Sequence, residues 1–166
     1  IFVAVNLGQF NQPAGKENSW VFQFDAKTLQ ETKRFPVPEL VHGAGGMAYY
    51  NGRFMVIGGL PKGTNENYMY EYDTNFKFIS RHVINSGYTE MGIQTIAYAN
   101  GYWWLGCYGT PRTLLKVDKN FTIVGRSTFD ASVGIIPYSP QTFLISTNKV
   151  IPGQKLNTAK LKLAII

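Results

Sequence analysis

The fold is indicated by a stretch that occurs twice, as AYYNGRFMV at residues 48–56 and as AYANGYWWL at residues 97–105. Asn51 and Asn100 lie 49 positions apart, and a weaker copy, PYSPQTFLI, occupies residues 137–145. An Asn-Gly pair between apolar runs predicts a tight hairpin, because both central residues of a type I′ turn need positive φ. Each strong copy is therefore predicted to be two antiparallel strands joined by a short turn.

A second element recurs in step with the first, as WVFQFD at residues 20–25, YMYEYD at 68–73 and TLLKVD at 113–118. Each copy is an apolar or aromatic run that ends in Asp, whose side chain can bond its own downstream backbone and set a turn. A further run follows each Asp and alternates between apolar and polar residues, which is typical of an outer edge strand. These outer runs are predicted at residues 28–35, 76–84 and 121–129.

One repeat unit therefore reads as four antiparallel strands, and successive units are offset by 45–49 residues. Propeller blades repeat every ~40–50 residues, so the period predicts an all-β chain made of β-propeller blades. A helical solenoid is the competing repeat architecture. It would require apolar residues at three- and four-residue spacing, and the sequence has no convincing run of that kind.

We predict one partial propeller domain over residues 1–166, with repeats at approximately 1–42, 43–91, 92–131 and 132–166. The first unit lacks its innermost strand and the last unit lacks its outer strand. This leaves about three and a half blades, or 14 strands in sets of three, four, four and three. Because propellers close with about 4–8 blades, we expect remaining blades or partner chains to complete the ring, and favour a longer chain.

The composition is that of a folded β protein, with 45% hydrophobic and 16% charged residues and with 10 Tyr, 11 Phe and 3 Trp. Aromatic and β-branched side chains suit pleated, half-buried surfaces. The formal net charge is +6, but the basic residues are scattered. A nucleic-acid site requires a basic stripe or an aromatic platform set in one, so no nucleic-acid partner is expected.

The single cysteine, Cys107, lies in an apolar run and is predicted to be a buried structural thiol. A chain with one cysteine forms no internal disulfide, so its cysteine content indicates neither an oxidising nor a reducing compartment. No apolar stretch reaches the roughly 18 residues needed to span a bilayer. The Tyr-, Asn- and Gly-rich composition leads us to expect an extracytoplasmic protein, secreted or periplasmic.

Two repeat units resemble known propeller families. GGMAYYNGRFMVIGG at residues 45–59, followed by YMYEYD, is similar to a kelch repeat in its double glycine and its aromatic-Asp ending. The next unit resembles blades of the bacterial and plant glutaminyl cyclotransferases in QTIAY, GCYG and LLKVD, and departs from them at Thr95, where that family usually has Gly. Each resemblance covers about one blade and implies the fold far more strongly than an activity.

Candidate catalytic residues come from the segments that enter the innermost strands, because these segments line one mouth of a propeller channel. The aligned copies place four polar side chains there, namely His42, Glu90, Gln94 and Asp130. Two carboxylates and an imidazole could coordinate a divalent cation in the channel or act as acid and base. Solvated loop residues and a turn-capping histidine are the open structural alternative. The sequence contains no HExxH, paired-cysteine or phosphate-loop motif, so no cofactor or metal site is predicted.

Candidate ligand-binding residues belong to the connections between second and third strands, at residues 8–19, 60–67 and 109–112. These loops are expected on the same face of successive blades, and they vary in length as binding loops do. Stacking and hydrogen bonds to a sugar or peptide are predicted for their aromatic and polar side chains, with ordinary loop variation as the alternative. The residues concerned are Phe10, Asn11, Tyr108 and Arg112.

The sequence thus favours a ligand- or partner-binding module for a small carbohydrate or peptide. The alternative is a propeller lyase, hydrolase or cyclotransferase that works in the central channel with the four candidate catalytic residues. An interaction scaffold with an empty channel is a third interpretation. Trp103 and Trp104, which must face opposite sides of one strand, are predicted to pack between blades.

Overall fold

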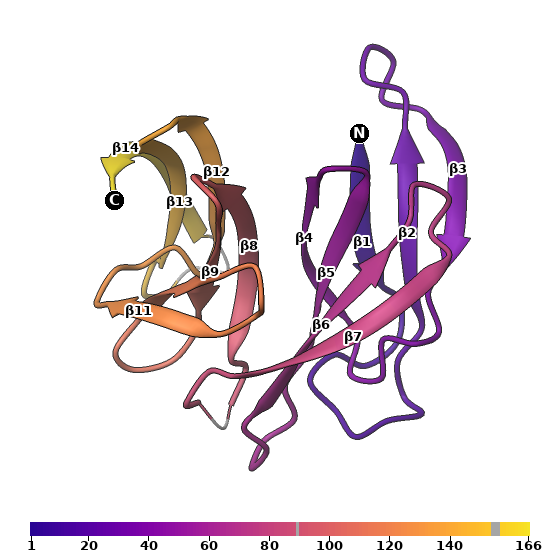
Figure 1. Cartoon of the computed structure of the whole chain (residues 1–166), viewed down its shortest axis with the longest axis horizontal. Coiled ribbons are helices and arrows are strands. Elements are labelled where there is room, and N and C mark those ends of the chain that lie inside the picture. The colour runs from indigo at the N-terminus through magenta and orange to yellow at the C-terminus, as the bar shows by residue number, and fades with distance from the viewer. Residues whose placement is uncertain (89, 154–156) are drawn as a thin grey trace.

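The computed structural model describes residues 1–88, 90–153 and 157–166, and within these ranges the chain contains strands and no helix. The strands form four antiparallel sheets (Figure 1). The first sheet comprises β1 (Phe2–Asn6), β2 (Ser19–Phe24) and β3 (Glu31–Pro36), and the second comprises β4 (Ala44–Tyr50), β5 (Arg53–Gly58), β6 (Glu66–Tyr72) and β7 (Phe78–Asn85). The third comprises β8 (Ile93–Ala99), β9 (Tyr102–Cys107), β10 (Thr113–Val117) and β11 (Ile123–Ser127), and the fourth comprises β12 (Gly134–Ser139), β13 (Thr142–Val150) and β14 (Asn157–Ile165).

In every sheet each strand pairs with the strand that follows it in the chain. The predicted all-β class and the sets of three, four, four and three strands are therefore confirmed for the described residues. The first strands of neighbouring sheets lie side by side, since β1 contacts β4, β4 contacts β8, and β8 contacts β12. The described sheets do not close into a ring, and both termini lie in terminal sheets (Figure 1). Within the same residues, no helix that could cross a membrane is found.

The two Asn-Gly hairpins have the backbone geometry that the sequence predicts. Asn51 and Gly52 have φ of 49° and 76°, and Asn100 and Gly101 have φ of 54° and 81°. Positive φ at both central residues gives the turn the twist of the strands it joins. These turns connect β4 to β5 and β8 to β9.

The predicted Asp turns are also present. The Asp73 carboxylate accepts the backbone N–H groups of Asn75 at 2.8 Å and Lys77 at 2.9 Å, and Asp118 accepts those of Asn120 and Thr122, both at 2.9 Å. Hydrogen bonds to the ionised form stabilise it, so the backbone N–H groups hold the pKa of Asp73 below its ordinary value.

The core lies between the sheets, in three clusters of buried side chains. Alternate residues of one strand point to opposite faces, so Phe54 packs toward the first sheet and Met55 toward the third. Trp103 packs toward the second sheet and Trp104 toward the fourth, which confirms their predicted role in packing between neighbouring sheets.

Cys107 ends β9 and is fully buried, as predicted. Burial raises the pKa of its thiol to about 12, and the thiolate is the reactive form. At pH 8 we expect the native thiol to react with a disulfide reagent ~1,000-fold more slowly than an unfolded cysteine. Absorbance after mixing with such a reagent, with and without urea, measures both rates. Equal rates would show that Cys107 is accessible.

Candidate functional site

The segment that enters β8 and the segment that leaves β9 together line a hollow of about 300 Å³. We call it the mouth hollow, because it lies where the sequence predicts the mouth of a channel. Its lining combines two tyrosine rings, a carboxylate and a thioether with two small residues. The lining residues are Tyr88, Glu90, Met91, Tyr108, Gly109 and Thr110.

Tyr108 supplies the exposed aromatic surface of the mouth hollow. The residue is 38% exposed, and the Arg112 guanidinium lies over its ring at 3.5 Å from the ring centre. Arg112 also donates to the Ser132 hydroxyl at 2.7 Å, and that hydroxyl donates to Asp130 at 2.8 Å. This chain of contacts holds the tyrosine ring in one orientation, with Arg112 on one face.

Tyr88 also lines the mouth hollow and is equally constrained. Its hydroxyl donates to the Pro111 carbonyl and lies 2.6 Å from the Thr113 hydroxyl. A Cβ atom at Gly109 would approach the Tyr88 ring to 2.4 Å, so the close contact requires glycine. The backbone N–H of Tyr108 donates to the Gly92 carbonyl at 2.7 Å, which fixes the two segments to each other.

Glu90 is exposed. Among the described residues that line this hollow, it carries the only carboxylate. Its backbone carbonyl accepts the N–H of Gly92 at 2.7 Å, which folds the segment back on itself. The Gln94 side chain reinforces this bend by donating to the carbonyls of Met91 and, at 3.2 Å, Ile93. Gln94 therefore shapes the segment that carries Glu90.

The remaining sequence candidates lie at the junction of the first and second sheets. A ring nitrogen of His42 is 2.9 Å from the Gln12 carbonyl, and the imidazole stacks on Tyr68 with ring centres 5.8 Å apart. Phe10 covers Gly43, where a Cβ atom would lie 2.5 Å from the phenyl ring. Asn11 accepts the N–H of Leu60 at 2.9 Å. These contacts organise a loop, and none of them involves a residue of the mouth hollow.

The structure therefore divides the predicted residues into two groups. In the first group Tyr108 and Glu90 line the mouth hollow, Arg112 contacts Tyr108 and is linked through Ser132 to Asp130, and Gln94 braces the segment that carries Glu90. The second group is formed by His42, Phe10 and Asn11 at the junction of the first and second sheets. Within residues 1–88, 90–153 and 157–166, no three His, Cys, Asp or Glu side chains are close enough to share a metal ion.

A second hollow, of about 210 Å³, runs along the first strands of the second, third and fourth sheets. A propeller channel would lie along these strands. The lining is apolar or aromatic throughout, and Met47, Tyr49, Ile96, Tyr98 and Ile136 supply its larger side chains. The polar groups available for chemistry are therefore at the mouth rather than along this wall.

Two important residues are not evident from the sequence. Tyr88 has no counterpart at an equivalent position of the other repeats, so alignment gives no signal for it. Ser132 links Arg112 to Asp130, and a small residue two positions after an aspartate is unremarkable in a loop. A serine able to bond the Asp130 carboxylate as a local turn is the signal that could have found it.

No protein-family model matches the chain, and no curated protein matches it. The resemblances of single units to kelch and glutaminyl cyclotransferase blades stay predictions.

Proposed function

We propose that the chain is an arc of β-propeller blades that binds a carbohydrate in the mouth hollow. The arrangement of the sheets supports the propeller interpretation. Each sheet pairs its strands in chain order, and the first strands of neighbouring sheets lie side by side. Each interior sheet is packed on both faces, as a blade within a ring would be.

The outward faces of the first and fourth sheets, which we call the terminal sheets, support the proposal that further blades or partner chains cover them. On the fourth sheet Ile136 and Leu163 are both opposite Leu144, so they share one face with Leu161 and Ile165. Contiguous exposed apolar surface marks a face that another element covers. Exposed aliphatic side chains on or next to these sheets include Ile1 and Val3 at the first sheet and Ile136, Val150, Leu161, Leu163 and Ile165 at the fourth.

These faces predict that the isolated chain self-associates. Lysine at both Leu161 and Leu163, which are 69% and 58% exposed, should render it monomeric because charged side chains would be buried on association. Sedimentation velocity over a concentration series measures this. A wild-type chain that stays monomeric throughout would argue against the proposed coverage of the terminal faces.

The observation that carries the binding proposal is the fixed tyrosine of the mouth hollow. Arg112 is held by Ser132 and stacks on Tyr108 at 3.5 Å, so the ring needs no reorganisation when a ligand arrives. A preorganised aromatic side chain lowers the entropy cost of binding. A pyranose has an apolar face that can stack on such a ring, and its hydroxyls can donate to the Glu90 carboxylate.

Catalysis in the channel has less support from the contacts. The alternative requires His42, Glu90, Gln94 and Asp130 to act on one substrate. His42 faces Gln12 and Tyr68, Gln94 donates to backbone carbonyls, and Asp130 accepts from Ser132. A role in holding loops accounts for these three side chains, which leaves Glu90 as the member of the set that faces the hollow.

A panel of immobilised oligosaccharides tests the binding proposal. We expect the wild-type chain to capture at least one, and Tyr108→Ala to raise its Kd about tenfold or more through the lost stacking. Tyr138→Ala is the matched control, because that tyrosine is 70% exposed on β12 and does not line the hollow. Capture of peptides but no sugar would overturn the carbohydrate assignment, and unaltered affinity in Tyr108→Ala would overturn the site.

A further inference from the structure

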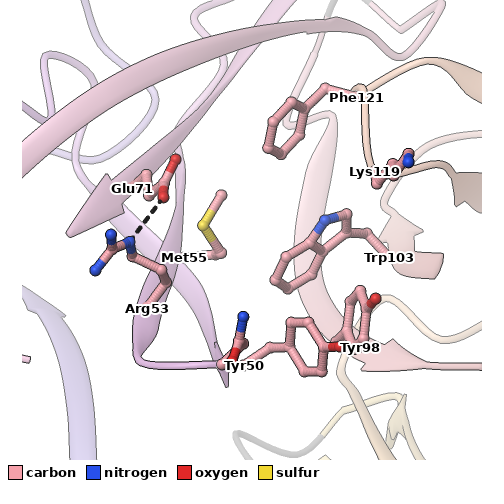
Figure 2. A pocket seen from close by; sticks show the side chains of 9 residues that line it. Tyr50, Arg53, Met55, Glu71, Tyr98, Trp103, Lys119 and Phe121 are labelled. Atoms are coloured by element: carbon pink, nitrogen blue, oxygen red, sulfur yellow. Dashed lines mark ion pairs between the residues drawn. The ribbon is translucent and has the colours of Figure 1, made fainter. Parts of the chain in front are cut away.

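A third hollow, a cavity of about 180 Å³, lies between the second and third sheets (Figure 2). It is at the other end of the strands from the mouth hollow. Tyr50 and Tyr98 come from the ends of β4 and β8, whereas Glu90 precedes β8. We call this space the inter-sheet cavity. Its volume is below the ~300 Å³ of the smallest drug-sized pockets, so it suits a ligand of one ring.

The third sheet gives the inter-sheet cavity an aromatic wall. Trp103 meets Tyr98 edge to face, with ring centres 4.6 Å apart, and Tyr50, at the end of β4 in the second sheet, stacks on Tyr98 at 3.6 Å. Phe121 completes the wall and is held by stacking on His82 at 3.5 Å. Figure 2 shows these rings facing Met55 across the open space, with the indole nitrogen of Trp103 on the side toward Phe121.

The second sheet gives the facing wall a charged pair. Arg53 Nε is 3.2 Å from one Glu71 oxygen, and the other oxygen accepts from Ser80 at 3.1 Å and lies 3.1 Å from His82 Nε2. The Glu71 side chain is only 20% exposed, whereas Arg53 is 49% exposed. The carboxylate is thus fixed by three neighbours, and the guanidinium retains exposed donors.

Lys119 adds a second cation at the rim, on the turn that follows β10. The lining then carries two cations and one carboxylate, and that carboxylate already accepts from Arg53. This excess of positive charge disfavours a quaternary ammonium ligand, although aromatic cages often bind such ligands. A negatively charged ligand is favoured, because a guanidinium binds carboxylate in a bidentate manner and an ammonium adds a point charge.

The two walls together define a ligand with an apolar face, polar edges and a negative charge. We propose that the inter-sheet cavity binds a single pyranose ring that carries a carboxylate, a hexuronic acid. The apolar face of the sugar packs against the part of the Trp103 indole that lines the cavity. Its carboxylate binds Arg53 and Lys119, and a hydroxyl donates to Glu71. This site is independent of the carbohydrate site proposed at the mouth hollow, and either assignment can fail without the other.

Titration with D-glucuronate, followed by tryptophan fluorescence, tests the proposal. We expect a saturable change that Trp103→Phe abolishes, since the other tryptophans, Trp20 and Trp104, do not line the cavity. D-glucose and benzoate are the comparison probes, because glucose lacks the charge and benzoate lacks the hydroxyls. Each should bind at least about tenfold more weakly than the uronate.

Two variants test which cations bind the carboxylate of the uronate. Lys119→Gln should raise the Kd for D-glucuronate several-fold without affecting the fold, since Lys119 is exposed. Arg53→Gln should raise it about tenfold or more. Arg34→Gln is the matched control, because Arg34 pairs with Glu31 on β3 away from the cavity. Tyr108→Ala should leave this Kd unchanged, which separates the result from the mouth hollow.

Four results would overturn the proposal. These are no fluorescence change at hundreds of millimolar glucuronate, equal binding of glucose, equal or tighter binding of benzoate, and wild-type affinity in both charge variants.

Discussion

Phe143→Ala is expected to lower the free energy of unfolding by about 3–5 kcal/mol, the cost of truncating a fully buried phenylalanine. Phe143 is 0% exposed and lies in the cluster that joins the third and fourth sheets. Its ring meets Trp104 edge to face, with ring centres 5.5 Å apart. The substitution leaves a cavity between two sheets that share no strand, so their docking is weakened as well as the local packing.

Urea denaturation followed by circular dichroism measures this loss. Since domains of this kind are stable by only about 5–15 kcal/mol, the midpoint should fall steeply and the variant can approach complete unfolding. The exposed Tyr138→Ala is the control and should remain within about 0.5 kcal/mol of wild type. A cost below about 1 kcal/mol for Phe143→Ala would show that the third and fourth sheets do not pack through this side chain.

Gly46→Ala is expected to force the first strands of the second and third sheets apart. A Cβ atom at Gly46 would lie 2.7 Å from the Gln94 carbonyl oxygen and 2.9 Å from the Thr95 Cα. Both contacts are with backbone, so no side chain can move aside. Overpacking of this kind costs about 1–3 kcal/mol, and occasionally more.

The matched control is Gly125→Ala on β11. There the added Cβ would have the Lys116 side chain as its nearest neighbour, at 3.3 Å. Its effect should stay within about 0.5 kcal/mol in the same urea titration. If Gly46→Ala were as stable as Gly125→Ala, β4 and β8 would not approach each other closely, and the side-by-side arrangement of first strands would be wrong.

Much of the fold could be predicted because local chemistry repeats along the chain. Asn51-Gly52 and Asn100-Gly101 specify the same turn twice, and Asp73 and Asp118 accept backbone N–H groups in the same way. One position inside these Asp turns gave no such signal. Phe76 and Phe121 adopt φ of 59° and 63° within the turns that Asp73 and Asp118 begin, although large residues rarely do so. Here packing decides the backbone, and Phe121 is thereby placed in the inter-sheet cavity.

The site was only partly predictable, because it depends on contacts between loops of different length. Alignment of the repeats singled out Glu90 and, as part of a separate set, Tyr108, but it gave no sign that the two residues line the same hollow. The alignment placed His42 at the same level of the predicted channel as Glu90. In the structure, however, the longer loop after β1 contacts His42 through Gln12. Phe10 was expected to face a ligand. It lies over Gly43, a position where the absence of a side chain leaves room for the ring.

Carbohydrate binding at the mouth hollow is tested most directly by NMR mapping of the ¹⁵N-labelled chain titrated with an oligosaccharide captured from the panel. The largest amide shift changes are predicted at the segments that line the hollow, around Glu90 to Gly92 and around Tyr108 to Arg112. Tyr108→Ala should suppress these changes at the same ligand concentration. Shift changes confined to other parts of the chain, or none at saturating oligosaccharide, would contradict the proposed site.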